Sequence, residues 1–239
     1  MKTSLVLLIT AIFFILLSAT TIQKKEKVIQ INIDHILNAR SVTTLTNGKL
    51  VTWTMGIDGN GAADGYLTQS SSLFKGDKNP HALPDNPLIP ATNLHPEVLL
   101  NYNNNDSISN QTVAVSGKGS FGFDVPSSRY SEIFLALTSS EGASQIKVEM
   151  HYTDGMESKS FEVPDYYRDI QANNPNYCYL VHDLAKWGKM NNMTEKNHHN
   201  IDLLNIHPNP NRILTHIQIA KSEAGYLVFW ATIGVTVIE

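Results

Sequence analysis

The chain has 239 residues, of which 42% are hydrophobic and 17% charged, with a formal net charge of −4 at pH 7. Its basic residues form no tract beyond the short cluster at positions 24–27. The composition therefore argues against a nucleic-acid partner, because phosphate backbones are bound by clustered lysine and arginine. Cys178 is the only cysteine, so no disulfide can form within the chain and an ordinary hydrophobic core must stabilise it.

The first twenty residues predict export. Lys2 precedes an apolar run at positions 5–17, in which Thr10 is the one polar residue, and small and polar residues follow at 18–21. This order is typical of a secretory signal peptide, and the run is shorter than the ~20 residues that span a bilayer. We expect residues 1–20 to be a signal peptide and the mature protein to be secreted or at the cell surface, with no membrane span. The alternative is an uncleaved anchor, since the apolar stretch can be extended to Ile22.

Alternation of apolar and polar residues with period two dominates the rest of the chain, which predicts β-strands. Asp154 and Gly155 separate two such runs and form a hairpin turn signal. Helical signal is confined to a short turn at 183–187, ending at Gly188. The sequence therefore predicts an all-β antiparallel sandwich. Its expected strands are residues 28–33, 49–54, 98–102, 111–115, 120–125, 132–138, 145–152, 158–163, 177–182, 212–219 and 226–237.

Three segments carry little strand signal and are expected to be long loops. They are residues 56–96, 164–176 and 186–211. Long ordered loops on a rigid sandwich usually carry function. No segment has the composition of a linker, so we expect residues 21–239 to form a single domain.

The first of these loops contains a possible calcium site. Asp58, Asn60 and Asp64 offer hard oxygen ligands, and the glycines between them let backbone carbonyls turn inward. The opening resembles an EF-hand loop, but Ala62 and Ala63 stand where the third ligand and the glycine are required. The alternative is a turn rich in glycine, asparagine and aspartate without a metal.

Sequence signatures of known reactions are missing. Residues 117–122 satisfy G-x-G-x-x-G, but a strand and Pro126 follow where a dinucleotide site requires a helix. The chain has no H-E-x-x-H and no G-x-S-x-G. His182 and Asp183 could form a catalytic or structural pair, which keeps a hydrolase open as an alternative.

Aromatic residues in the expected loops are the remaining indication of function. Tyr166 and Tyr167 lie beside Arg168, and Trp187 ends the expected helical turn. Carbohydrate sites use exposed aromatic faces against sugar rings and polar side chains for the hydroxyl groups. We therefore predict a ligand site at these four residues. The alternative for the three aromatic residues is packing in the core.

The mature chain resembles the galactose-binding-like jelly-roll class of secreted β-sandwiches in strand rhythm, loop lengths and the closing pair of strands at 212–219 and 226–237. That resemblance implies glycan binding through the end loops, with calcium as a possible cofactor. The favoured function is a secreted, non-catalytic protein that binds carbohydrate or cell-surface glycan. The alternatives are a secreted hydrolase of polysaccharide or ester bonds and a structural protein of a matrix or coat. Sequons at Asn105, Asn110 and Asn192 would make it a glycoprotein in a host that glycosylates.

Overall fold

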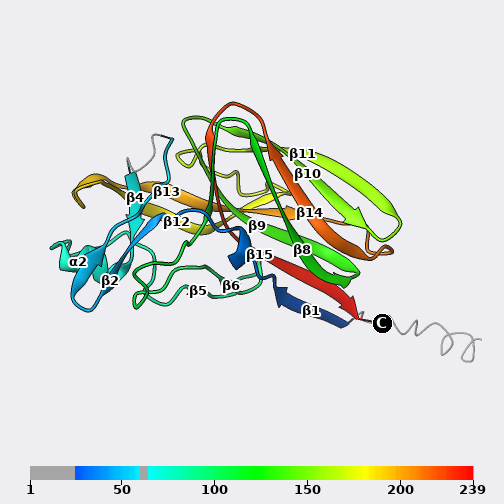
Figure 1. The fold of residues 1–239 in the computed structure, drawn as a ribbon, viewed down its shortest axis with the longest axis horizontal. Helices are drawn as coiled ribbons and strands as arrows, with labels where there is room; N and C mark the ends of the chain where they lie inside the picture. Colours follow the sequence, from blue (N-terminus) through cyan, green and yellow to red (C-terminus); the bar gives the residue numbers. More distant parts are fainter. Residues whose placement is uncertain (1–24, 60–63, 239) are drawn as a thin grey trace, which may run out of the picture.

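The computed structural model describes residues 25–59 and 64–238, and the expected signal peptide and Asn60 lie outside these residues. Two sheets face each other (Figure 1), and their strands pair antiparallel except for β2 and β4, which are parallel. The large sheet has the strand order β1-β15-β9-β13-β12-β4-β2-β3, and β7 pairs with β15 beside this path. Its strands are β1 (Lys25–Gln30), β2 (Val42–Thr46), β3 (Lys49–Val51), β4 (Asp64–Leu67), β7 (Val113–Ser116), β9 (Tyr130–Ser140), β12 (Tyr177–Gly188), β13 (Met193–Ile206) and β15 (Tyr226–Ile238).

The smaller sheet has four strands in the order β11-β10-β14-β8. These are β8 (Gly119–Ser128), β10 (Ser144–Tyr152), β11 (Gly155–Val163) and β14 (Leu214–Lys221). Asp154 and Gly155 join β10 to β11 as the predicted hairpin, in which Tyr152 pairs with Gly155. Short elements complete the described chain: η1 (Asp34–Ile36), α2 (Gln69–Phe74), β5 (Leu88–Ile89) and β6 (Val98–Leu99).

The centre of the large sheet is buried on both faces. Side chains of β9 alternate between two cores: Ile133, Leu135 and Leu137 pack toward the smaller sheet, whereas Phe134 and Ala136 pack on the opposite side. The first core lies between the two sheets, as is typical of a sandwich. The second core is covered by loops and by β5 and β6, whose Ile89 and Val98 belong to it. The predicted all-β sandwich is therefore confirmed.

Expectations about two segments are wrong. Residues 183–187 belong to β12, because they pair with β13 and β4 instead of closing a helical turn. Residues 193–206, within an expected loop, form β13, a strand between β9 and β12. The two closing strands form as expected, as β14 and β15, and they lie in different sheets.

The glycine at position 234 of β15 is required by close packing. A Cβ atom built there would lie 2.3 Å from Cε1 of Tyr130, whose ring is fully buried. We predict that Gly234→Ala lowers the free energy of unfolding by about 1–3 kcal/mol, because the Tyr130 ring must shift within a filled core. Urea unfolding monitored by tryptophan fluorescence measures this loss. Ser160→Ala, on an exposed part of β11, is the control and should leave the midpoint unchanged.

Candidate functional site

A buried lysine organises the end of the large sheet where β4, β12 and β13 meet. Lys186 of β12 is 7% exposed, and its ammonium nitrogen lies 2.9 Å from Oε1 of Glu195. The same nitrogen lies 3.6 Å from Oδ2 of Asp58 and 3.5 Å from Oδ2 of Asp64. A buried ammonium requires such partners, because it loses its hydration on folding. Lys186 therefore joins the 56–59 segment, β4 and β13.

Two tyrosine hydroxyls complete the surroundings of the Lys186 ammonium. The hydroxyl of Tyr166 lies 3.3 Å from Nζ and that of Tyr167 3.5 Å from it. Tyr167 also donates its hydroxyl proton to Oε2 of Glu195. The rings of Tyr166 and Tyr167 stack with centroids 4.6 Å apart, and both pack on the buried ring of His199.

The electrostatics of this cluster fix its protonation. Burial lowers the pKa of Lys186, but hydrogen bonds to Glu195 and Tyr166 outweigh it and the pKa is raised. Burial raises the pKa of Glu195, but the Tyr167 hydroxyl and Lys186 outweigh it and the pKa is lowered. Burial and the charge of Asp64 raise the pKa of Asp58. Lys186 is therefore a permanent cation, which suits it to hold the loop and not to act as a nucleophile or base.

The predicted calcium ligands thus face a side-chain cation. Asp58 and Asp64 each direct one carboxylate oxygen toward Lys186, while Asn60 lies outside the described residues. Within residues 25–59 and 64–238, no three His, Cys, Asp or Glu side chains are placed to hold a metal ion. Calcium at this loop stays a prediction. Among the described residues, the ion pairs with Lys186 account for the positions of Asp58 and Asp64.

The four predicted ligand residues separate into two buried and two exposed. Tyr166 and Trp187 are each 3% exposed, so the expectation that they present free aromatic faces is corrected: Tyr166 packs on His199, and Trp187 packs with Trp53 and Leu67. Tyr167 is 37% exposed, and Arg168 is exposed beside it.

Tyr167 and Arg168 line an open pocket of about 700 Å³. Its other lining residues are Gly142, Ala143, Glu162, Pro164 and Asp165. The Asp165 carboxylate accepts hydrogen bonds from the backbone amides of Gly142, at 2.7 Å, and Tyr167, at 3.2 Å. The pocket wall is therefore braced on one side by Asp165 and on the other by the cluster around Lys186.

The histidine and aspartate considered for a hydrolase do not form the expected pair. The Asp183 carboxylate lies 3.0 Å from Nδ1 of His81 and accepts the backbone amide of His198. His182 instead is exposed, with its ring 4.6 Å from that of Tyr179. Asp183 has a positive φ of 65° and lies at the register shift between Val181 and Leu184, so the strand is irregular where these two residues diverge.

Sequence reasoning missed Lys186, Glu195 and His199, the residues that hold Tyr167 in place. Lys186 was assigned to a helical turn and Glu195 to a loop, so their convergence could not be anticipated. Four register shifts between β12 and β13 bring them together. Such bulges leave no signal in the alternation of single residues.

Comparisons with known proteins add little to this site. No protein-family model matches the chain, and no curated protein matches it. One similar solved structure is a carbohydrate-binding module, CBM28, specific for non-crystalline cellulose: 9% identity and a TM-score of 0.28, covering 59% of this chain and 78% of the module. Another is TmCBM61 in complex with β-1,4-galactotriose: 14% identity and a TM-score of 0.26, covering 59% and 82%. At these TM-scores neither likeness carries an argument about function.

No helix among the described residues is long and apolar enough to cross a membrane.

The Cys178 thiol is free and half-buried, and burial raises its pKa to about 11. A thiol with so high a pKa is a poor nucleophile at neutral pH, in keeping with the inert cysteine of a strand.

We predict that Lys186→Met lowers the free energy of unfolding by about 3–5 kcal/mol at neutral pH, because Asp58, Asp64 and Glu195 would lose their shared cation. The deficit should shrink as the pH falls and these carboxylates become protonated. Chemical denaturation at several pH values between neutral and acidic measures the loss of unfolding free energy and its decrease at low pH. Lys159→Met, at an exposed position of β11, is the control. A loss equal to the control's would contradict the central role of Lys186.

Asp202 of β13 gives a second pH-dependent prediction. It is 1% exposed, and burial raises its pKa to about 8. The folded state therefore holds a proton that the unfolded chain releases near pH 4, so this contribution to stability is complete below about pH 4 and is lost as the pH rises to about 8. Asp202→Asn should remove this loss. The difference in unfolding free energy, variant minus wild type, should grow between about pH 5 and pH 8. A difference in unfolding free energy that stays constant with pH would show that the pKa of Asp202 is the same in the folded and unfolded states.

Proposed function

We propose that this chain is a secreted or cell-surface protein that binds carbohydrate without a catalytic role, through the pocket of Tyr167 and Arg168. The observation that carries the proposal is the state of the Tyr167 ring. It is held by Tyr166, His199 and Glu195, yet 37% of the residue stays exposed in a pocket of about 700 Å³. A ring fixed before binding loses little side-chain entropy when a ligand stacks on it.

The polar groups around this ring suit a hydroxylated ligand. Arg168 supplies N–H donors in a planar fork, whereas Glu162 supplies acceptor oxygens from the end of β11. Pro164 and Ala143 add apolar surface. Alternating donors, acceptors and apolar patches match the edges and faces of a sugar ring. The Tyr167 hydroxyl is already hydrogen-bonded to Glu195, and burial raises its pKa, so we favour a binding role for the exposed ring over hydrolysis by the hydroxyl.

The test is a glycan array probed with the purified protein, in calcium and in chelator. We expect selective binding that Arg168→Ala weakens about tenfold, because a charge-assisted hydrogen bond is lost. Tyr167→Ala should weaken binding as much, whereas Tyr167→Phe should retain more, since it keeps the ring. Lys147→Ala removes another exposed cationic side chain, from β10, and is the matched control.

Binding that survives both Arg168→Ala and Tyr167→Ala would place the glycan elsewhere on the molecule. Absence of binding to any glycan, with the folded state verified by circular dichroism, would overturn the proposal. Loss of binding in chelator would extend it to calcium at the loop of Asp58 and Asp64. Sequencing the amino terminus of the protein from the culture medium would test export and cleavage near residue 20.

A further inference from the structure

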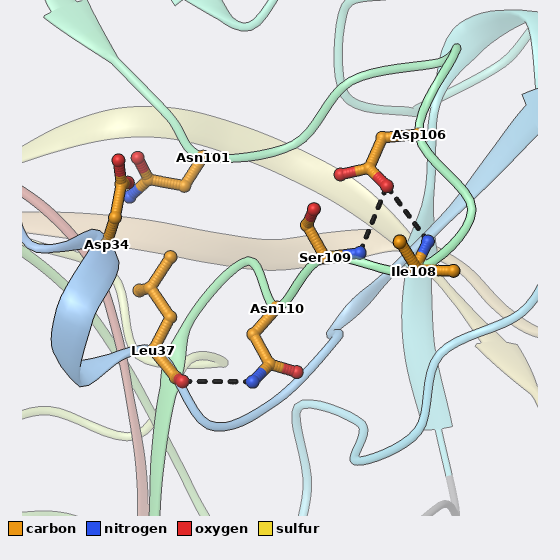
Figure 2. Close-up of a pocket in the computed structure, with 7 residues that line it drawn as sticks. All are labelled: Asp34, Leu37, Asn101, Asp106, Ile108, Ser109 and Asn110. Carbon is orange, nitrogen blue, oxygen red and sulfur yellow. Dashed lines mark hydrogen bonds between the residues drawn. The ribbon is translucent and has the colours of Figure 1, made fainter.

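A second pocket lies away from Tyr167 and shares no lining residue with the first (Figure 2). Its volume is about 620 Å³, and it is an open pocket lined by η1 and Leu37, by Asn101 after β6 and by the 106–110 loop. The side chains that matter below are Asp34, Leu37, Asn101, Asp106, Ile108 and Asn110. This volume lies within the range of sites for small organic ligands.

Hydrogen bonds to main-chain carbonyls set the orientation of its two amides. Nδ2 of Asn101 donates to the carbonyl of Trp230 at 2.8 Å, and Nδ2 of Asn110 donates to the carbonyl of Leu37 at 2.9 Å. A carbonyl oxygen can only accept, so these nitrogens cannot exchange places with the amide oxygens. The oxygens of Asn101 and Asn110 are therefore left as acceptors for a ligand.

The charge of the pocket has one sign. Asp34 and Asp106 contribute carboxylates, and no lysine, arginine or histidine is among the described residues that line it. Burial raises the pKa of Asp106, but hydrogen bonds from Ser109 and the Ile108 amide outweigh it, so the pKa is lowered and the group is ionised at neutral pH. Oδ1 of Asp106 accepts hydrogen bonds from the backbone amides of Ile108 and Ser109. Figure 2 shows the other carboxylate oxygen turned away from these amides.

The nearest buried cation is directed elsewhere. Arg40 is 3% exposed and lies behind the 106–110 loop. Its guanidinium donates to the carbonyls of Ser109 and Asp106 and to the hydroxyl of Thr44. Arg40 therefore holds the wall of the pocket in place without offering those donors to a ligand.

The lining does not favour a bare metal ion. A calcium ion requires six to eight oxygens at about 2.3–2.6 Å, whereas two carboxylates line this pocket and no three His, Cys, Asp or Glu side chains of the described residues are placed to hold a metal. Leu37 and Ile108, the latter 86% exposed, add apolar surface for a carbon skeleton. An ammonium group has three donors and no acceptor, which complements carboxylates and amide oxygens.

We propose that this pocket binds an organic ammonium ligand with a hydroxylated skeleton, of the class of amino sugars with a free amine. The Asp34 carboxylate would receive the ammonium, Asp106 would add negative charge from the opposite side of the pocket (Figure 2), and the amide oxygens of Asn101 and Asn110 would receive hydroxyl groups. The site stands independently of carbohydrate binding at Tyr167, because the two pockets share no residue.

Isothermal titration of the purified protein with a fully deacetylated glucosamine trimer tests the proposal. Its N-acetylated counterpart is the chemical control, since it keeps the hydroxyl groups but lacks the cation. We expect the amine form to bind and the acetylated form to bind at least about tenfold more weakly at this pocket. Asp34→Asn should weaken the amine form about tenfold. Asp124→Asn makes the same change at an exposed position of β8 in the other sheet, and should change affinity less than about twofold.

Equal binding of both trimers would overturn the ammonium assignment. An equal loss of affinity in Asp34→Asn and Asp124→Asn would also overturn it, because the effect would then come from the net charge of the protein alone. Binding of calcium chloride that Asp34→Asn abolishes, without binding of the amine, would replace the proposal with a metal site. Arg168→Ala separates the two pockets: it should leave amine binding at Asp34 unchanged even if the Tyr167 pocket binds no glycan. Loss of amine binding in Arg168→Ala would place the amine at the first pocket and overturn the second.

Discussion

The charge of Lys186 is the constraint on which the proposed glycan site depends. A buried ammonium without partners costs several kcal/mol, so the chain must bring carboxylates to it from separate segments. Asp58, Asp64 and Glu195 meet this requirement from three places in the sequence. In doing so they fix the end of the large sheet, and Tyr167 rests on the assembled group with its hydroxyl on Glu195. The Tyr167 ring, which would contact a ligand, is thus positioned by the ion pairs that Lys186 makes with the carboxylates around it.

Burial of only one face of the smaller sheet explains why much of the fold could be predicted from alternation. Strands such as β10, whose outer face is solvated, show clean alternation, with Ile146, Val148 and Met150 buried. The turn at Asp154 and Gly155 has its own chemistry and was located from the dipeptide alone. The sandwich and most strand positions follow from these two local signals.

The remaining elements could not be predicted because their determinants are not local. β13 carries polar residues at 194–200, several of them exposed, so its sequence has the composition of a loop. It becomes a strand because β9 and β12 supply hydrogen-bonding partners on both sides. For the same reason Trp187 and Tyr166 could not be assigned to the core or the surface beforehand. Of the predicted ligand site, Tyr167 and Arg168 stay exposed, and the supporting residues became visible only in three dimensions.

The position of β15 has a consequence for how the molecule forms. It pairs with β9 along one edge and with both β1 and β7 along the other, so Gln30 lies opposite Ile233. The strand that follows all the other described strands in the sequence is therefore an interior strand of the large sheet, paired along both of its edges. Neither core can close until that strand has docked, and each contact it makes spans a long stretch of chain. Folding should therefore be slow and concerted, because β1, β7 and β9 lack a pairing strand until β15 has been synthesised.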